Sequence, residues 1–105
     1  MMKLKYKNGK SEIAVKFIHK PDERNTICHL YDGDELITTS TAFCKKEPNY
    51  VKSVGRKVCL TKALDNLSYK YTEDDKGKMQ MSKYYLDKHY RTEIWTSYFL
   101  NCKEN

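Results

Sequence analysis

Apolar and polar residues alternate along the first part of the chain with the two-residue period of a β-strand. In "KLKYK", residues 3–7, and in "EIAVKFI", residues 12–18, apolar side chains recur on one face. Asn8 and Gly9 lie between these two runs and form a strong hairpin signal, because both residue types tolerate a positive φ. The pattern predicts two antiparallel strands joined by a tight turn.

Further turn signals divide the rest of residues 2–44. Pro21 has no N–H to donate to a neighbouring strand, so the second strand should end there and "KPDERN" should form a loop. "TICHLY" follows as a strand, "DGDE" around Gly33 supplies the next turn, and "LITTSTAF" is rich in β-branched residues. We therefore predict an antiparallel meander of three or four strands.

The second half of the chain changes to helical spacing. We predict a helix over about residues 49–67, with Asn49 as its N-cap. "TEDDKGK" breaks the pattern and predicts a loop over about residues 70–78. A second helical segment is predicted over about residues 79–101, and its irregular phase around His89 is compatible with a kink or with two shorter helices. The apolar positions of the first helix that should face the sheet are Val51, Val54, Val58, Leu60, Ala63, Leu64 and Leu67.

A sheet with one apolar face needs a cover, which the two C-terminal helices can supply. The predicted fold class is therefore α+β, an antiparallel meander of three or four strands covered by two C-terminal helices, in one domain over residues 1–105. No apolar run has the length of about 20 residues that spans a bilayer, and the first residues lack a signal-peptide core, so we expect a soluble, cytoplasmic protein. In that compartment the cysteines should be free thiols, mostly buried. They are Cys28, Cys44, Cys59 and Cys102.

The formal net charge of +6 is unevenly distributed. Residues 1–20 carry six lysines against one glutamate, residues 21–44 carry one arginine against five acids, and residues 45–62 carry six cations against one glutamate. Two basic blocks therefore flank an acidic one. This pattern favours attraction of a polyanion or of an acidic protein, although an unevenly charged solvated surface explains it as well.

The first helix carries most of the second basic block. If its valines pack inward, Lys52, Arg56 and Lys57 should point outward and form a basic face. Such a face suits either phosphate groups or an acidic groove on a protein. For any single lysine, ordinary solvent exposure is the alternative interpretation. The candidate partner-binding residues are Lys45, Lys46, Lys52, Arg56, Lys57 and Lys62, with Lys3, Lys5 and Lys7 as further candidates.

Motifs for catalysis, metals and cofactors are missing from the sequence. It contains no CxxC, no HxxxH and no glycine-rich phosphate loop, so we expect no catalytic residue, no metal site and no cofactor. Cys44 and His29 can meet only through folding, and no motif supports that pair as a nucleophile and base. An enzymatic function therefore ranks behind two binding functions.

Two segments resemble a group of small phage-encoded proteins: "AFCKKEPNYVKSVGRKVCLTKAL", residues 42–64, and "RTEIWTSYF", residues 91–99. That group has a β-rich N-terminal half, a "GRKxxLxxAL" helix and an "R..IW..Y" helix. This chain departs from the pattern with Cys59 in place of the usual Ala, Lys62 in place of Arg, and a longer insert between the helices. The matching positions are Ala42, Cys44, Tyr50, Lys52, Gly55, Arg56, Leu60, Ala63, Leu64, Arg91, Ile94, Trp95 and Tyr98.

The resemblance implies a phage or prophage origin and assigns no catalytic residue. On this basis we expect a non-catalytic accessory protein that binds and inhibits a host macromolecule with an acidic surface, in the cytoplasm of an infected or lysogenic cell. A nucleic-acid-handling defence effector is one candidate partner, which would make this an anti-CRISPR-like counter-defence protein. The alternative is direct DNA or RNA binding by the basic face and tyrosines that stack on bases.

Overall fold

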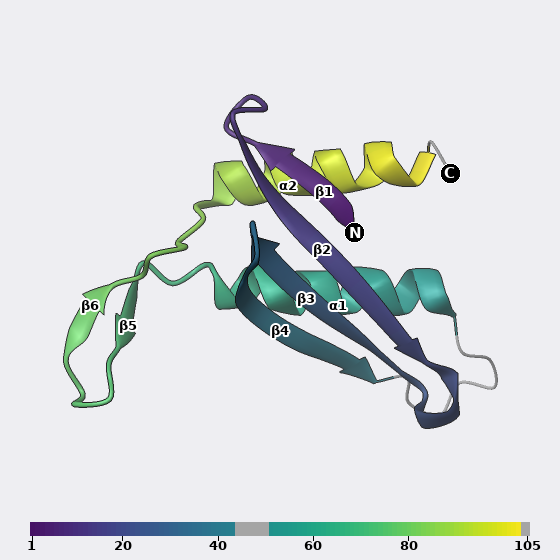
Figure 1. The fold of residues 1–105 in the computed structure, drawn as a ribbon, viewed down its shortest axis with the longest axis horizontal. Coiled ribbons are helices and arrows are strands. Elements are labelled where there is room, and N and C mark those ends of the chain that lie inside the picture. Colours follow the sequence, from purple (N-terminus) through teal and green to yellow (C-terminus); the bar gives the residue numbers. More distant parts are fainter. Residues whose placement is uncertain (44–50, 104–105) are drawn as a thin grey trace.

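The computed structural model describes residues 1–43 and 51–103, which form an α+β fold (Figure 1). The predicted fold class and the four-strand meander are confirmed. The main antiparallel sheet has the order β1-β2-β3-β4 and contains β1 (Met2–Tyr6), β2 (Ser11–Lys20), β3 (Asn25–Asp32) and β4 (Glu35–Phe43). The remaining elements are the 3-10 helix η1 (Pro21–Glu23), α1 (Lys52–Asn66), the hairpin strands β5 (Tyr71–Glu73) and β6 (Met79–Met81), and α2 (Lys88–Lys103).

The turns of the meander lie where the sequence signals predicted them. Lys7, Asn8 and Gly9 all have positive φ angles, and the Gly9 N–H donates to the Tyr6 carbonyl over 3.2 Å. The first hairpin is therefore confirmed, although its loop has four residues, 7–10, rather than two. Gly33 has a φ of +61° and begins the short turn between β3 and β4.

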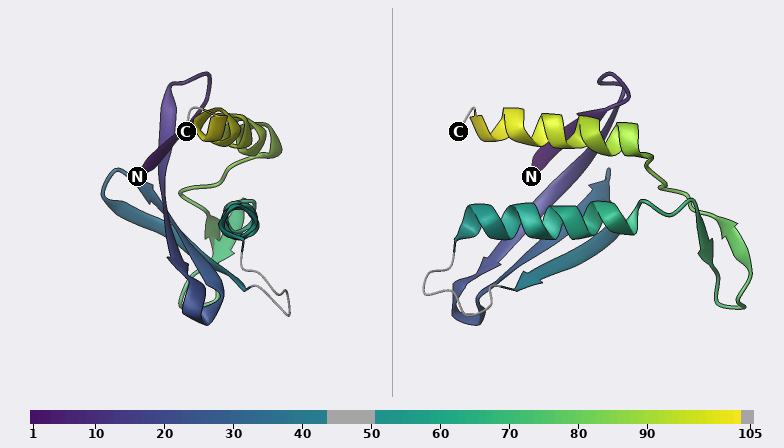
Figure 2. Two further views of the ribbon diagram at one scale, coloured as in Figure 1. Left: turned by 90° about the vertical axis from the view of Figure 1, so that its right-hand side faces the viewer. Right: turned by 180° about the vertical axis from the view of Figure 1, so that it is seen from behind.

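Both helices cover the same face of the sheet (Figure 2). α1 packs on β3 and β4, and α2 packs on β1. The strand register places Leu4 opposite Ile13 and Val15 opposite Leu30, and all four side chains are buried beneath the helices. The prediction that two C-terminal helices cover the meander is confirmed.

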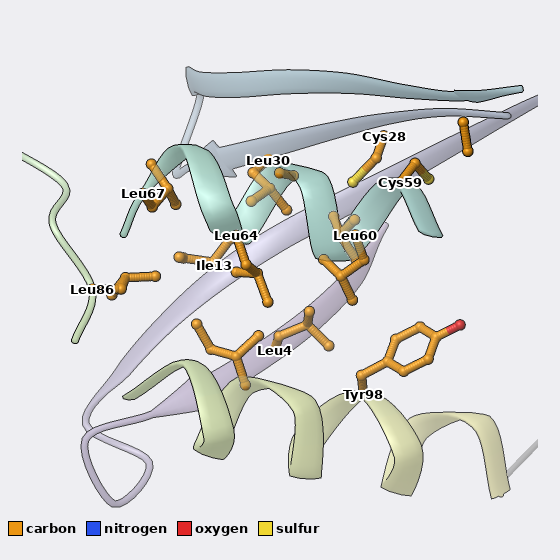
Figure 3. Close-up of a cluster of buried hydrophobic side chains, with 14 residues drawn as sticks. Leu4, Ile13, Cys28, Leu30, Cys59, Leu60, Leu64, Leu67, Leu86 and Tyr98 are labelled. Carbon is orange, nitrogen blue, oxygen red and sulfur yellow. The ribbon is translucent and has the colours of Figure 1, made fainter. Parts of the chain in front are cut away.

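The hydrophobic core lies between the sheet and the two helices (Figure 3). Phe17 extends it through an edge-to-face contact with Tyr98, with 6.2 Å between the ring centroids. The core thus joins all four strands and both helices into one packed unit. Its buried members are Leu4, Ile13, Val15, Cys28, Leu30, Ala42, Cys59, Leu60, Ala63, Leu64, Leu67, Leu86, Ile94 and Tyr98.

The face that α1 turns to the sheet differs from the predicted one. Val51, Val54 and Val58 are 48%, 56% and 40% exposed, so the prediction that they pack inward is wrong. Val58 and Leu60 are two positions apart, which is roughly 200° around a helix, so the valines and the leucines form separate stripes. The leucine stripe faces the core because leucine offers more apolar area than valine.

The predicted loop over residues 70–78 is confirmed only for residues 74–78, because Tyr71–Glu73 form β5, and the first part of the predicted second helix is wrong. β5 and β6 pair as an antiparallel hairpin that projects from the body of the fold (Figure 1). The Asp74 carboxylate accepts the backbone N–H groups of Lys76 and Lys78 over 2.9 Å each, and Gly77 adopts a φ of +78°. This Asx-type turn reverses the chain and makes a strand of Met79–Met81.

α2 begins later than predicted, at Lys88, and runs as one helix. The Asp87 carboxylate accepts the Tyr90 backbone N–H over 2.8 Å and so caps the first turn. The irregular phase near His89 therefore marks the start of the helix rather than a kink. Asn49, the predicted cap of the first helix, lies outside the described residues, and α1 is preceded by Val51 in an extended conformation.

The segment between the hairpin and α2 is fixed to the sheet by a small polar cluster. The Tyr84 hydroxyl donates to the Glu35 carboxylate, and Lys83 Nζ lies 3.5 Å from the same carboxylate. The Leu86 N–H donates to the Leu67 carbonyl over 2.9 Å. These contacts attach the start of β4 and the end of α1 to the linker that leads into α2.

A pair of substitutions in α1 tests which side of the helix is buried. Leu60→Ala should lower the free energy of unfolding by about 2–5 kcal/mol, because it leaves a cavity in the core. Val54→Ala should change it by less than about 0.5 kcal/mol, because Val54 is exposed. Urea unfolding followed by circular dichroism measures both. Equal losses in the two variants would contradict the observed phase of α1.

The hydrogen bond from Tyr84 to Glu35 predicts that the stability of the fold decreases at acidic pH. The hydrogen bond from Tyr84, followed by the charge of Lys83, lowers the pKa of Glu35 from its ordinary value of 4.5. Glu35 therefore contributes stability above pH 4.5 that is lost as the pH falls through its lowered pKa. In Tyr84→Phe the pKa of Glu35 should rise towards 4.5, as measured by carboxyl NMR titration. An unchanged titration midpoint would show that the hydroxyl does not donate to Glu35.

Candidate functional site

The solvent-facing side of α1 combines apolar and basic side chains. We call Val51, Val54 and Val58 the valine stripe. They are spaced i, i+3 and i+7 and lie on one side of the helix, away from the sheet. Lys52 and Lys57 are also exposed, and the first turn of α1 contains no acidic residue. This side of α1 is therefore an apolar strip with positive charge beside it.

The apolar surface continues from α1 onto α2. Lys57 Nζ lies 5.7 Å from the centroid of the Phe99 ring, which is a cation–π arrangement between the two helices. Phe99 is 46% exposed and stacks on Trp95 with 5.7 Å between centroids and 25° between ring planes. Lys57 thus connects the valine stripe to an aromatic pair on α2.

The other predicted cations of the second basic block have different surroundings. Lys62 is exposed, but its Nζ atom donates to the Thr41 carbonyl of β4 over 3.1 Å, which helps to hold α1 on the sheet. Lys45 and Lys46 lie outside the described residues. The structure therefore does not place the six predicted residues on one continuous face.

The N-terminal lysines belong to a different part of the surface. Lys3 Nζ lies 3.9 Å from the Glu12 carboxylate, and Lys7 Nζ lies 5.5 Å from the centroid of the Tyr90 ring. Lys5 is exposed. These residues lie on β1 and the following turn, which pack against α2, whereas α1 packs on β3 and β4. They do not extend the basic face of α1.

Arg56 is half-buried and turns towards the sheet, so the prediction that it points outward is wrong. Its guanidinium lies near enough to the Tyr98 hydroxyl to oppose the rise that burial causes in the pKa of that group. It lines a cavity of about 750 Å³ between the strands and the helices. The lining residues are Met1, Met2, Val15, Lys16, Phe17, His19, Arg56 and Cys102.

The electrostatics of this cavity are positive. Burial lowers the pKa of His19, and the nearby charges of Arg56 and Lys52 lower it further. Burial raises the pKa of Tyr98, and the hydrogen bond with Arg56 opposes that rise. None of the described lining residues is an acid. The cavity is therefore suited to a ligand that carries a negative charge and an apolar part.

Sequence reasoning missed this cavity, although two signals pointed to it. Phe17 and His19 continue the inward-facing positions of β2 that begin at Ile13. Arg56 precedes Leu60 and Leu64 at intervals of four residues, so it belongs to the buried side of α1. Taking the leucines rather than the valines as the inner stripe would have turned Arg56 inward.

The described residues provide no evident metal centre. Among residues 1–43 and 51–103, no three His, Cys, Asp or Glu side chains gather to hold a metal ion. Cys28 and Cys59 are buried free thiols, as predicted, whereas Cys102 is exposed. Cys44, the thiol considered as a partner of His29, lies outside the described residues.

Burial of two thiols predicts selective alkylation. Iodoacetamide should modify Cys102 well before Cys28 or Cys59, because only Cys102 is exposed. The contact with the Cys59 sulfur, together with burial, also raises the pKa of Cys28 and keeps it protonated. Peptide mass spectrometry over a time course measures the three rates. Modification of Cys28 as fast as Cys102 would show that the core is open.

Comparisons with known proteins assign no family to the chain. No family model matches it, and no curated protein or solved structure matches it significantly. In the part of the chain that the structure describes, neither helix is long and apolar enough to cross a membrane. The surfaces described above and the resemblance to small phage-encoded proteins are therefore the observations that bear on function.

Proposed function

We propose that this protein is a non-catalytic, phage-type accessory protein that binds and inhibits a host protein with an acidic surface in the cytoplasm. The valine stripe, exposed beside Lys57 on a helix that begins with the exposed Lys52, is the observation that carries the proposal. The proposed host protein is a nucleic-acid-handling defence effector. A phage-encoded inhibitor of such an effector would be an anti-CRISPR-like counter-defence protein. The resemblance at residues 42–64 and 91–99 supports that origin.

The valine stripe suits a groove on another protein. Exposed valines at i, i+3 and i+7 match the way an amphipathic helix docks its apolar side into a hydrophobic groove. Burial of apolar surface contributes about 25 cal/mol per Å² removed from water. Val51, Val54 and Val58 contribute little of this to folding, because they are 40–56% exposed. Burial of these three valines against a partner would add this apolar free energy to the stability of the complex.

The lysines beside the stripe contribute in a different way. Positive charges at the rim of an interface speed up association with an acidic partner and reject basic ones. Lys52 is exposed at the start of α1, and Lys57 is fixed over the Phe99 ring between the helices. Steering by these charges predicts faster binding at low salt, whereas the valines should control how long the complex lasts.

Direct nucleic-acid binding remains the second candidate function. Arg56 and Lys16, which line the cavity, and Lys52, whose charge acts on His19, favour it, because the described lining contains no acid that would repel phosphate. The exposed valines weigh against it, since a phosphate backbone offers no apolar groove. Salt dependence separates the candidates: phosphate binding should fall about a thousandfold or more between 50 and 200 mM salt if six or more phosphates are contacted.

The first step of the test captures a partner from host lysate on this protein, which carries an affinity tag. The captured partner is then purified. Val54→Asp together with Val58→Asp should increase the dissociation rate about tenfold or more, because the interface loses apolar burial and gains two buried carboxylates. Lys52→Glu together with Lys57→Glu should mainly slow association and abolish its salt dependence. Biolayer interferometry measures both rates. The captured protein's own activity should fall on complex formation.

Met79→Asp together with Met81→Asp is the matched control, because these side chains are 62% and 66% exposed but lie on the projecting hairpin. Its rates should match those of the unmodified protein. The proposal fails if the valine pair and the methionine pair behave alike, or if the complex forms without affecting the activity of the host protein. It also fails if only nucleic acid is retained.

A further inference from the structure

β2 has an unpaired edge where it extends past β1. β1 pairs with β2 only as far as the contact between Met2 and Val15, whereas β2 continues to Lys20 along β3 (Figure 1). Among the described residues, no strand pairs with residues 16–18 on the β1 side. Backbone N–H and C=O groups at such an edge form a template for another strand.

The cavity described above opens at this same edge. Val15, Lys16 and Phe17 of β2 contribute to its lining, and Met2 of β1 lies at the point where the pairing ends. Arg56 reaches the cavity from α1. A strand added beside β2 would therefore place alternate side chains into a preformed space.

The lining selects the chemistry of the added strand. Phe17 and Met2 are half-buried and leave apolar surface at the cavity wall. Arg56 forms no ion pair with a carboxylate among the described residues, and its fork of N–H donors matches a carboxylate in a bidentate arrangement. The volume of about 750 Å³ accommodates several side chains.

We propose that the β2 edge at residues 16–18 and the adjoining cavity bind an extended acidic segment of a protein by strand addition. A Glu or Asp carboxylate of that segment pairs with Arg56, and an apolar neighbour packs on Phe17. The site is separate from the valine stripe and lies on the opposite side of α1. It shares with the proposed function only the premise that a partner is a protein, and synthetic peptides test it without that partner.

A strand of peptide fits this site better than single-stranded nucleic acid. Edge amides and carbonyls of β2 pair with the backbone of a peptide, whereas a phosphate backbone can use only the donors. Methionine, valine and phenylalanine residues contribute to the wall beside the edge, and the basic residues among the described lining are Lys16, His19 and Arg56. Nucleic acid is therefore a competing outcome of the experiment.

The experiment uses fluorescently labelled, capped heptapeptides in an anisotropy titration. A peptide of alternating valine and glutamate should bind about tenfold or more tightly than its valine–lysine counterpart, because Arg56 attracts one and repels the other. Replacement of its central residue by proline should weaken it, because proline cannot donate to the β2 edge. A ten-nucleotide oligo-thymidine is the nucleic-acid probe.

Variants and NMR locate the binding site. Arg56→Gln should weaken the valine–glutamate peptide by about tenfold, whereas Lys62→Gln, on the same helix but bonded to β4, should leave it unchanged. Val54→Asp with Val58→Asp should also leave it unchanged, which separates this site from the valine stripe. Peptide addition should shift the backbone amide signals of Lys16, Phe17 and Ile18 even if Arg56→Gln fails to fold.

Several results would overturn the proposal. These are no binding of the valine–glutamate peptide at millimolar concentration, equal binding of the acidic and basic peptides, and amide shifts that leave residues 16–18 unaffected. Preferential binding of oligo-thymidine that is lost in Arg56→Gln would assign the cavity to nucleic acid instead. If the valine variants lose the complex with the host protein but still bind the valine–glutamate peptide, the strand-addition site is supported independently of the proposed function.

Discussion

The packing of Leu60, Leu64 and Leu67 against β3 and β4 sets the orientation of everything else on α1. Once these leucines face the sheet, helical geometry leaves no freedom for the other positions. The valine stripe must face solvent, and Arg56, four positions before Leu60, must turn towards the strands. A single packing constraint therefore creates two surfaces of different chemistry on one helix.

In the two binding proposals, these surfaces have different roles. The valine stripe with Lys57 presents apolar area and positive charge on one exposed face of α1. The cavity beside β2 presents a concave space with Arg56 at its wall and an unpaired strand edge at its rim. A helix face and a strand edge recognise a protein through different secondary-structure contacts, so a partner that uses both is held in a defined orientation.

The sheet was predictable because its signals are local. The two-residue alternation and the turn residues near Gly9 and Gly33 act on neighbouring positions and do not depend on the rest of the fold. The inner side of α1 was not predictable in this way. The valine stripe and the leucine stripe are both apolar, and only packing against β3 and β4 decides which of them faces the sheet. The β5–β6 hairpin was missed because the turn bonds of Asp74 outweigh the helical spacing of Met81, Tyr84 and Tyr85. The cavity combines residues from both ends of the chain and from its middle, which no local pattern joins.

Methyl NMR in the presence of a soluble nitroxide measures which side of α1 faces solvent. The nitroxide broadens the signals of methyl groups that solvent can reach. The structure predicts strong broadening for the methyl groups of Val54 and Val58 and protection for those of Leu60 and Leu64. Protection of the valines with broadening of the leucines would mean that α1 has the opposite orientation and that the valine stripe belongs to the core.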